Sequence, residues 1–198
     1  MQYIEESTGT TIMAVTTTDG VIIAADTRTS SGSYVSSKLT DKLTKITDRI
    51  YCCRSGSAAD TQIIARIVRN EIEKIERSEN KPVTVRMVAN LIKHFIYNYK
   101  LLAGIIVAGY DDVEGGAIYS IKLGGTIIQE DISLGGSGSL FIYGYCDSMY
   151  RKDMLDTEKE VFVKDAVRLA IKRDGASGGC IRMGRITKDG ISRVNFKL

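Results

Sequence analysis

The first half of the chain changes from strand-like to helical spacing of its apolar residues near residue 60. Before that point, runs of β-branched and apolar residues are separated by polar turns, of which Thr18-Asp19-Gly20 predicts a hairpin. Isoleucines and valines then recur at helical spacing from Ile63 to Ile75, with charged residues between them. A second helix is predicted to begin near Thr84, a favourable N-cap. The strands predicted in this half cover residues 11–16, 21–26, 34–37, 43–46 and 50–54.

The second half repeats the order of strands followed by helices and then closes with a hairpin. One of its helices is predicted to open with the capping box Thr157-x-x-Glu160. Because helices come in pairs between groups of hairpins, the chain does not form βαβ units. We therefore predict an α+β fold, a four-layer αββα sandwich of two antiparallel sheets flanked by helix pairs. The strands predicted here cover residues 104–109, 117–123, 126–134, 180–186 and 191–196, and the other helix covers 139–150.

Composition and charge narrow the function classes. The chain has 198 residues, enough for one domain, and a net charge of +3 with Lys and Arg dispersed among Asp and Glu. The absence of a basic run argues against nucleic-acid binding. No stretch has the roughly 18 uninterrupted apolar residues of a membrane span, and the acidic N-terminus resembles neither a signal nor a transit peptide. We expect an intracellular protein that binds neither nucleic acid nor membrane.

The cysteines do not suggest a disulfide framework or a metal centre. Cys52 and Cys53 are adjacent, there is no CxxC motif, and His94 is the one histidine in the sequence. We expect buried free thiols, no metal and no cofactor.

The usual catalytic groups are scarce in this sequence. The presence of only one histidine argues against a serine–histidine triad, and residues 135–138 lack the lysine of a phosphate-binding loop. A free α-amine is another base, with an ordinary pKa of roughly 7.7–8.0. It lies next to a hydroxyl when the first residue is Ser, Thr or Cys. Cleavage between Gly9 and Thr10 would create that arrangement, although by composition alone Thr10 simply opens a strand.

Seven short motifs follow one another along the chain after residue 8. They are GTTIMAV (9–15), ADTR (25–28), TDKL (40–43), CRSGSAAD (53–60), AGIIVAGYD (103–111), GSGS (136–139) and DGASGG (174–179). Each is weak alone, but in this order they resemble the catalytic beta subunits of the 20S proteasome, and most of all the eukaryotic post-acidic (caspase-like) type, beta type-6. The resemblance implies the N-terminal nucleophile hydrolase fold and threonine endopeptidase activity.

The resemblance also implies catalytic roles for residues far apart in the sequence. Thr10 is the expected nucleophile, with its freed α-amine as base. Lys42 is expected beside the Thr10 hydroxyl, where its charge favours the ionised oxygen, and Asp26 is expected to hold that ammonium in place. Gly56 resembles the residue whose backbone N–H stabilises the oxyanion. The residues expected to assist the amine and the proton transfers are Ser137, Asp174 and Ser177.

The hairpin allows one geometric check on Asp26. A three-residue loop with Gly20 in a bulge would set Asp26 opposite Ile12. Residues two apart on a strand point the same way, so Asp26 would then share a face with Thr10. A two-residue Asp19-Gly20 turn would place it on the other face.

The resemblance assigns substrate binding to a second set of residues. Arg54 matches the position at the base of the primary substrate pocket, where a cation favours substrates that are acidic before the cut bond. The positions that resemble those holding the substrate backbone as an added strand are Thr29, Ser30 and Ala58.

Residue by residue, plainer interpretations exist. Lys42 and Arg54 could be solvated cations, Asp26 a carboxylate at a turn edge, Gly56 a strand-to-helix turn and Asp174 a turn cap.

The resemblance divides the chain into a leader, residues 1–9, removed between Gly9 and Thr10, and a catalytic domain, residues 10–198. It implies alpha-ring and other beta-ring partners in a four-ring particle of twenty-eight subunits, regulatory caps, unfolded ubiquitin-targeted substrates, and a place in cytoplasm and nucleus. Two other hypotheses are a non-catalytic ring subunit that keeps its leader and a bacterial or archaeal ring protease. The set Thr10, Asp26, Lys42 and Ser137 argues against the first, and residues 52–54 favour the eukaryotic branch over the second.

Overall fold

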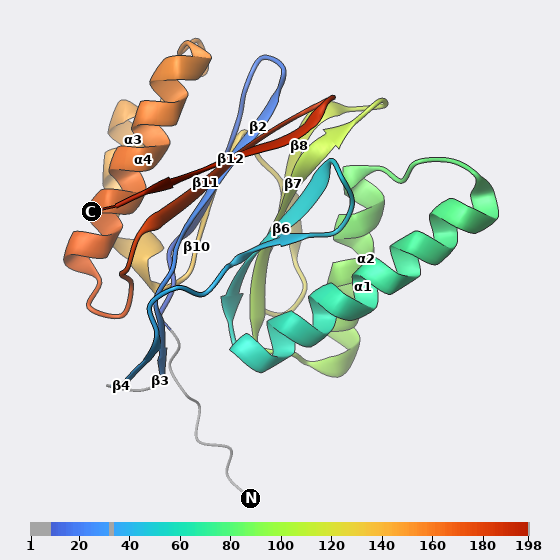
Figure 1. Ribbon diagram of the computed structural model, residues 1–198, viewed down its shortest axis with the longest axis horizontal. Coiled ribbons are helices and arrows are strands. Elements are labelled where there is room, and N and C mark those ends of the chain that lie inside the picture. Colours follow the sequence, from blue (N-terminus) through green and yellow to red (C-terminus); the bar gives the residue numbers. More distant parts are fainter. Residues whose placement is uncertain (1–8, 32–33, 198) are drawn as a thin grey trace, which may run out of the picture.

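The computed structural model describes residues 9–31 and 34–197, in which two antiparallel sheets lie face to face between helices (Figure 1). The first sheet has the order β10 (Ile132–Gly135), β1 (Ile12–Thr16), β2 (Gly20–Asp26), β11 (Ile181–Thr187) and β12 (Gly190–Phe196). The second has the order β5 (Leu43–Lys45), β6 (Ile50–Gly56), β7 (Ala103–Asp111), β8 (Gly115–Ile121) and β9 (Ile127–Gln129). A separate hairpin pairs β3 (Thr29–Ser31) with β4 (Tyr34–Ser37).

The helices cover the outer faces of both sheets. They are α1 (Ala58–Glu79), α2 (Val85–Tyr99), the 3₁₀ helix η1 (Ser137–Phe141), α3 (Tyr143–Met149) and α4 (Asp156–Arg173). Figure 1 shows α1 and α2 beside the second sheet and α3 and α4 beside the first. The predicted four-layer αββα sandwich is confirmed.

Three apolar clusters fill the spaces between the four layers. Strand β2 contributes to two of them: Ile22 and Ala24 pack toward α4, and Ile23 and Ala25 pack between the sheets. Because both faces of β2 are covered, all seven of its residues are buried and its sequence reads as a continuous apolar run. Burying each isoleucine contributes about 1.5–3 kcal/mol, which fixes the end of β2, and with it Asp26, in the interior.

The two long helices on the second sheet begin at side-chain caps. The Ser57 hydroxyl accepts from the Asp60 N–H before α1, and the Thr84 hydroxyl accepts from the Met87 N–H before α2, as predicted for Thr84. Such a cap contributes about 1 kcal/mol. The Ser57 cap also fixes where β6 ends and α1 starts, next to Gly56.

Three predicted elements differ from the structure. The helix expected over residues 139–150 is the 3₁₀ helix η1 followed by the short helix α3. The strand expected over residues 126–134 is two strands, since β9 pairs with β8 in one sheet and β10 pairs with β1 in the other. The capping box expected at Thr157 is also wrong, because α4 begins at Asp156 and Leu155 is its N-cap. There the Glu158 carboxylate accepts from the Leu155 N–H at 2.8 Å, and acidic residues in the first turn favour the positive helix end.

Across residues 9–31 and 34–197, the helices lack the combination of length and apolar character needed to cross a bilayer.

Candidate active site

The Gly9–Thr10 peptide lies just before β1. Both residues are buried, with Thr10 only 4% exposed. The Thr10 hydroxyl donates to the Gly9 carbonyl oxygen at 2.7 Å, and the Thr10 N–H donates to the Ser137 hydroxyl at 3.1 Å. Ser137 reaches this position because β10 pairs with β1, with Gly135 opposite Ile12.

Lys42 and Asp26 form a buried ion pair beside this peptide. The Lys42 ammonium lies 2.6 Å from the Asp26 carboxylate and also donates to the Gly9 carbonyl oxygen at 3.4 Å. Burial lowers the pKa of Lys42 below its ordinary value, although the Asp26 charge opposes the shift. Lys42 and the Thr10 hydroxyl therefore meet at one carbonyl oxygen.

The Asp26 carboxylate is fully engaged by donors besides Lys42. Backbone N–H groups of Thr11 (2.9 Å), Arg28 (3.1 Å) and Gly178 (2.9 Å) donate to it. A buried carboxylate with this many donors holds its partner in a single geometry, so Asp26 is placed to orient the Lys42 ammonium.

The predicted hairpin register is wrong by one residue. Ile12 pairs with Ala25, so the loop has two residues, Thr18-Asp19, and Asp26 comes opposite Thr11, where its N–H donates to the Thr11 carbonyl at 3.1 Å. Asp26 therefore does not share a face with Thr10. Its carboxylate reaches the site because β2 ends there and the side chain can turn to the Thr11 backbone.

Gly20 explains the error in register. It is the first residue of β2, and a Cβ on it would collide with the Ile186 carbonyl of β11. The glycine is therefore required by close strand packing rather than by a bulge in the turn.

Asp174, at the C-terminal end of α4, joins the serines predicted to surround Thr10. Ser137 and Ser177 both donate to its Oδ2 at 2.7 Å, and the Ala176 N–H donates to its Oδ1 at 3.0 Å. Burial alone would raise the pKa of Asp174, but these hydrogen bonds outweigh it and lower the pKa below its ordinary value. Asp174 is an anion at neutral pH.

Thr11 belongs to the same group and has no distinguishing signal in the sequence. Its buried hydroxyl lies 2.8 Å from the Ser177 hydroxyl. A Cβ on Gly138 would collide with that hydroxyl, and a Cβ on Gly136 would collide with the Thr10 carbonyl. The glycines on either side of Ser137 thus leave room for residues 10 and 11.

Gly9 is required by the loop that follows α4. A Cβ at this position would collide with the Cβ and the carbonyl oxygen of Ala176. Because part of this obstacle is backbone, it cannot swing aside as a flexible side chain can. Any larger residue would therefore displace the Gly9 carbonyl from Lys42.

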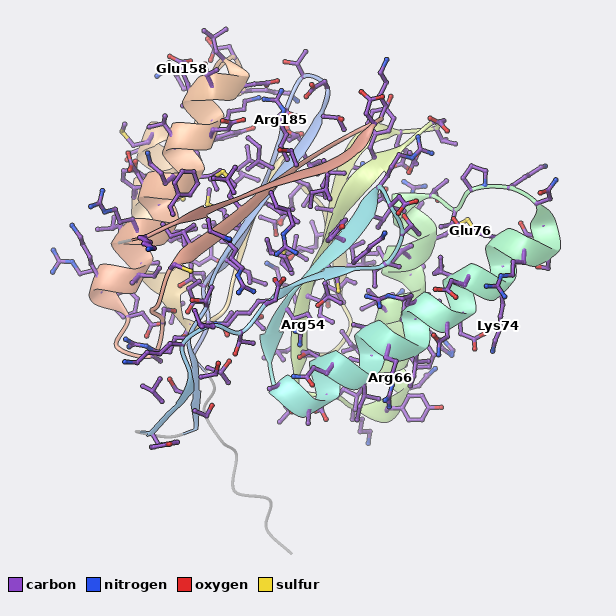
Figure 2. The ribbon with its side chains drawn as sticks, viewed as in Figure 1. Arg54, Arg66, Lys74, Glu76, Glu158 and Arg185 are labelled. Atoms are coloured by element: carbon purple, nitrogen blue, oxygen red, sulfur yellow. The ribbon has the colours of Figure 1, made fainter. Side chains whose placement is uncertain are left out.

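Gly56 and Arg54 lie at the end of β6, next to the start of α1. Gly56 has a φ of +98°, and a Cβ there would collide with the Leu102 carbonyl, so its backbone conformation needs glycine. Figure 2 shows Arg54 between β6 and α1. Its guanidinium is half-buried and held by a fixed set of acceptors, the Thr44 hydroxyl (2.7 Å), the Thr61 hydroxyl (3.3 Å) and the Asp41 carbonyl (2.7 Å).

The predicted strand-binding residues lie on two elements. Ala58 is the first residue of α1. Thr29 and Ser30 lie on β3, where the Thr29 hydroxyl donates to that of Thr40 at 2.8 Å and the Ser30 hydroxyl donates to the Ala176 carbonyl at 3.4 Å. In the described part of the chain β3 has one partner strand, β4, which leaves its other edge for an added strand.

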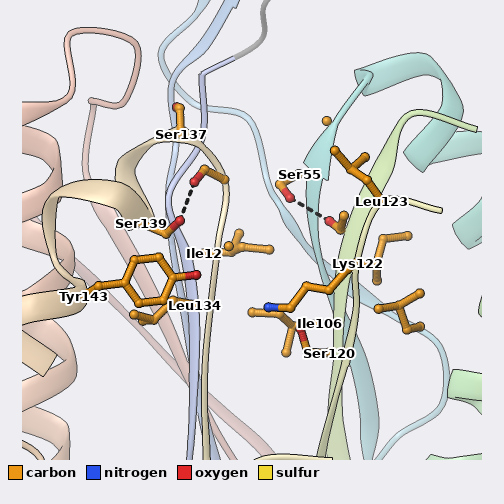
Figure 3. A pocket seen from close by; sticks show the side chains of 16 residues that line it. Ile12, Ser55, Ile106, Ser120, Lys122, Leu123, Leu134, Ser137, Ser139 and Tyr143 are labelled. Atoms are coloured by element: carbon orange, nitrogen blue, oxygen red, sulfur yellow. Dashed lines mark hydrogen bonds between the residues drawn. The ribbon is translucent and has the colours of Figure 1, made fainter. Parts of the chain in front are cut away.

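A cavity of about 470 Å³ opens between the sheets beside Gly56 and Ser137. Figure 3 shows Lys122 reaching from the β8 side toward Tyr143 on the opposite wall. Arg54 is not among its lining residues, because successive residues of a strand point to opposite faces and Ser55 lines it instead.

The cysteines form no disulfide bond. All four thiols are free; Cys52, Cys53 and Cys146 are buried, as predicted, whereas Cys180 is partly exposed. Burial raises the pKa of Cys52 to about 12, so its thiol is protonated and unreactive at neutral pH.

Comparison with known proteins identifies the family of this chain. A family model described as proteasome subunit matches residues 6–186. A probable proteasome subunit beta type-1 of Encephalitozoon cuniculi is 52% identical over 193 residues, 97% of this chain and 94% of that protein. Proteasome subunit beta type-1 of Saccharomyces cerevisiae is 50% identical over 194 residues, covering 97% and 90%. Proteasome subunit beta type-6 of Arabidopsis thaliana is 47% identical over 192 residues, covering 96% and 82%. The chain belongs to the proteasome subunit family.

The three relatives named above are beta subunits, of types 1 and 6. The chain is therefore a beta-type subunit of the 20S proteasome core.

Proposed function

We propose that this subunit is a threonine endopeptidase, with Thr10 as nucleophile and its freed α-amine as base. The observation that carries the proposal is the meeting of two groups at the Gly9 carbonyl oxygen: the Thr10 hydroxyl at 2.7 Å and the Lys42 ammonium at 3.4 Å. A hydroxyl next to a carbonyl polarised by a cation is the starting arrangement for acyl transfer.

The first reaction is self-cleavage of the Gly9–Thr10 bond. The Thr10 Oγ bonds to the Gly9 carbonyl carbon, the C–N bond breaks, and the hydroxyl proton passes to the released nitrogen. Water then hydrolyses the ester, which frees the leader, residues 1–9, with a carboxylate at Gly9 and restores the hydroxyl. Residues 1–8 lie outside the described part of the chain, so the leader is assigned by this chemistry and by resemblance.

The second reaction is hydrolysis of substrate peptides by the matured site. The Thr10 amine takes the hydroxyl proton as Oγ bonds to the peptide carbonyl carbon, and gives it to the leaving amine as the C–N bond breaks. Water then attacks the resulting ester on Thr10, and the amine passes a proton from that water to Oγ, which releases the fragment with a new carboxylate and restores the hydroxyl. The positive charge of Lys42 stabilises the Thr10 oxygen as it loses its proton. The Gly56 backbone takes the oxyanion-stabilising role by resemblance, and Ser137, Asp174 and Ser177 hold the amine in place.

Specificity for acidic residues before the cut bond follows from Arg54. Its guanidinium has five N–H donors, and three hydrogen bonds fix its plane. A substrate carboxylate would form charge-assisted bonds with the remaining donors. The β3 edge with Thr29, Ser30 and Ala58 would hold the substrate backbone.

By the same resemblance, the subunit works in the four-ring particle of cytoplasm and nucleus. Its substrates would be unfolded, ubiquitin-targeted chains delivered through regulatory caps.

Intact mass of the subunit, isolated from assembled particles, tests the proposal. We expect a chain that begins at Thr10 with an unmodified amine. A chain that still begins at Met1 in mature particles would instead indicate a structural ring subunit.

Replacing Arg54 with Ala is expected to lower kcat/KM for peptides with Glu or Asp before the cut by about 10- to 100-fold, the value of a charge-assisted hydrogen bond. Fluorogenic peptides that differ only at that residue measure the effect in whole particles. Arg66→Ala, on the exposed side of α1, is the matched control and should leave the rates unchanged. If the Arg54→Ala variant and the wild type cleaved acidic peptides equally well, Arg54 would not be the residue that binds the acidic side chain of the substrate.

A further inference from the structure

The side chain of Thr11 lies at the far end of the hydrogen-bonded chain that reaches Thr10. Its buried hydroxyl is 2.8 Å from that of Ser177, which donates to Asp174 at 2.7 Å. We propose that Thr11 is a positioning residue for the peptidase reaction: its hydroxyl donates to Ser177 and strengthens the hydrogen bond from Ser177 to Asp174, in the chain of bonds that reaches the Thr10 nitrogen. This inference rests on the function proposed above.

The direction of each hydrogen bond follows from counting protons. Asp174 is ionised and can only accept, so Ser137 and Ser177 must both donate to it. A hydroxyl has one proton. Ser177 has therefore none to give to Thr11, and Thr11 must be the donor of the 2.8 Å bond.

The same count decides what Ser137 can do for Thr10. Since its proton lies on the bond to Asp174, Ser137 can only accept from the Thr10 nitrogen, which lies 3.1 Å away. Once the α-amine is free, it donates one N–H to Ser137 and keeps its lone pair for the proton of the Thr10 hydroxyl. A Ser137 hydroxyl turned toward the amine would occupy that lone pair.

Thr11 acts on this arrangement through Ser177. A hydroxyl that accepts a hydrogen bond becomes a stronger donor, so the Thr11 bond strengthens the donation of Ser177 to Asp174. Without the Thr11 hydrogen bond, Ser177 donates more weakly, so less of the negative charge of Asp174 is neutralised there and Ser137 becomes more strongly polarised. The protonated form of the Thr10 amine, which lies beside Ser137, is then stabilised. Deprotonation of the amine then needs a higher pH.

The turn that carries Ser137 is built around the Thr11 hydroxyl. A Cβ on Gly138 would occupy the position of that hydroxyl, and the Gly138 N–H donates to the Thr10 carbonyl at 3.1 Å. One turn thus places Ser137 at the Thr10 nitrogen and also leaves space for the Thr11 side chain.

Thr11→Val keeps the shape of the side chain and removes the hydroxyl. In leader-free subunits of whole particles, we expect kcat for an acidic peptide to fall about 3- to 10-fold, the value of one neutral hydrogen bond, with KM unchanged. The rising limb of the kcat/KM pH profile should move to higher pH by about 0.3 unit, because part of the free energy of that hydrogen bond appears as a shift in the pKa of the amine. Thr11→Ser, which keeps the hydroxyl, should restore both rate and profile.

Thr16→Val is the matched control, because it removes a hydroxyl from the same strand that donates to the Asp131 carbonyl at 3.2 Å. It should leave the profile in place. A Thr11→Val enzyme with the wild-type profile, or one whose lower rate is not restored by Thr11→Ser, overturns the inference. Cleavage of acidic peptides that survives Thr10→Ala overturns the proposed function itself, which is a distinct result.

Discussion

Thr10→Ala is expected to leave residues 1–9 attached and to lower cleavage of acidic peptides by this subunit by at least about 1000-fold, as removal of a covalent nucleophile does. The Thr10 hydroxyl is the one that contacts the Gly9 carbonyl oxygen, at 2.7 Å, and the same hydroxyl would attack substrates. Intact mass reports on the leader. Fluorogenic peptides, assayed in particles with all other subunits unchanged, report on the activity.

Two controls separate the nucleophile from the leader. Thr10→Ser retains a hydroxyl and should still remove the leader. A Thr10→Ala subunit produced without residues 1–9 has no leader to block the site and should remain inactive. Activity in that second variant would assign catalysis to another group and contradict the proposal.

The layers of the fold could be predicted because the spacing of apolar residues distinguishes strands from helices, and the order of these elements along the chain indicates how they stack. The run Gly20–Asp26 is apolar throughout since a strand buried on both faces has no solvent side. The change of sheet between β9 and β10 could not be predicted in the same way. A strand keeps the same apolar pattern whichever sheet it joins, and the exchange depends on the distant partners β8 and β1.

The hairpin register shows where local reasoning failed. Turn residues suggested a bulge at Gly20, but the contact of that glycine with β11 decided its identity. The contacting strand lies far away in the sequence, as the pairing of Gly20 with Thr187 shows, so no local pattern could reveal it. A shift of one residue in register moved Thr11, not Ile12, opposite Asp26.

The candidate site was predicted in part by elimination and in part by resemblance. The scarcity of histidine pointed to an α-amine, and the resemblance pointed to Ser137, Asp174 and Ser177. In the structure hydrogen bonds join these three residues, and Ser137 contacts the Thr10 nitrogen. Thr11 escaped notice because one threonine in a β-branched run looks like any other. Only the structure shows that its hydroxyl completes the chain to Asp174.

Lys42→Met is the second change with a large expected effect. The single variant leaves the buried Asp26 carboxylate without its cation, which typically costs about 3–5 kcal/mol of folding free energy. It also removes the charge that stabilises the reacting oxygen, so we expect activity to fall by about 100- to 1000-fold. Denaturant unfolding of the subunit and peptide hydrolysis by assembled particles measure the two effects separately.

The double variant Lys42→Met/Asp26→Asn distinguishes stability from chemistry. Neutralising Asp26 removes the uncompensated charge, and its amide oxygen can still accept from the Thr11 N–H, so much of the lost stability should return. Activity should not return with it, because the variant has lost the cation that faces the Gly9 carbonyl position. Recovery of both together would mean that Lys42 serves folding alone.

The pH dependence of the wild type tests the same charge without a mutation. Burial lowers the pKa of Lys42, so the folded protein loses this ammonium at a lower pH than an exposed lysine with its ordinary value of 10.5. In the proposed mechanism the charged form is the active one. Activity should therefore decline as pH rises through the lowered pKa, giving a falling limb below 10.5 in the kcat profile. A profile that stays flat up to the alkaline unfolding of the particle would separate the Lys42 charge from the chemistry of Thr10.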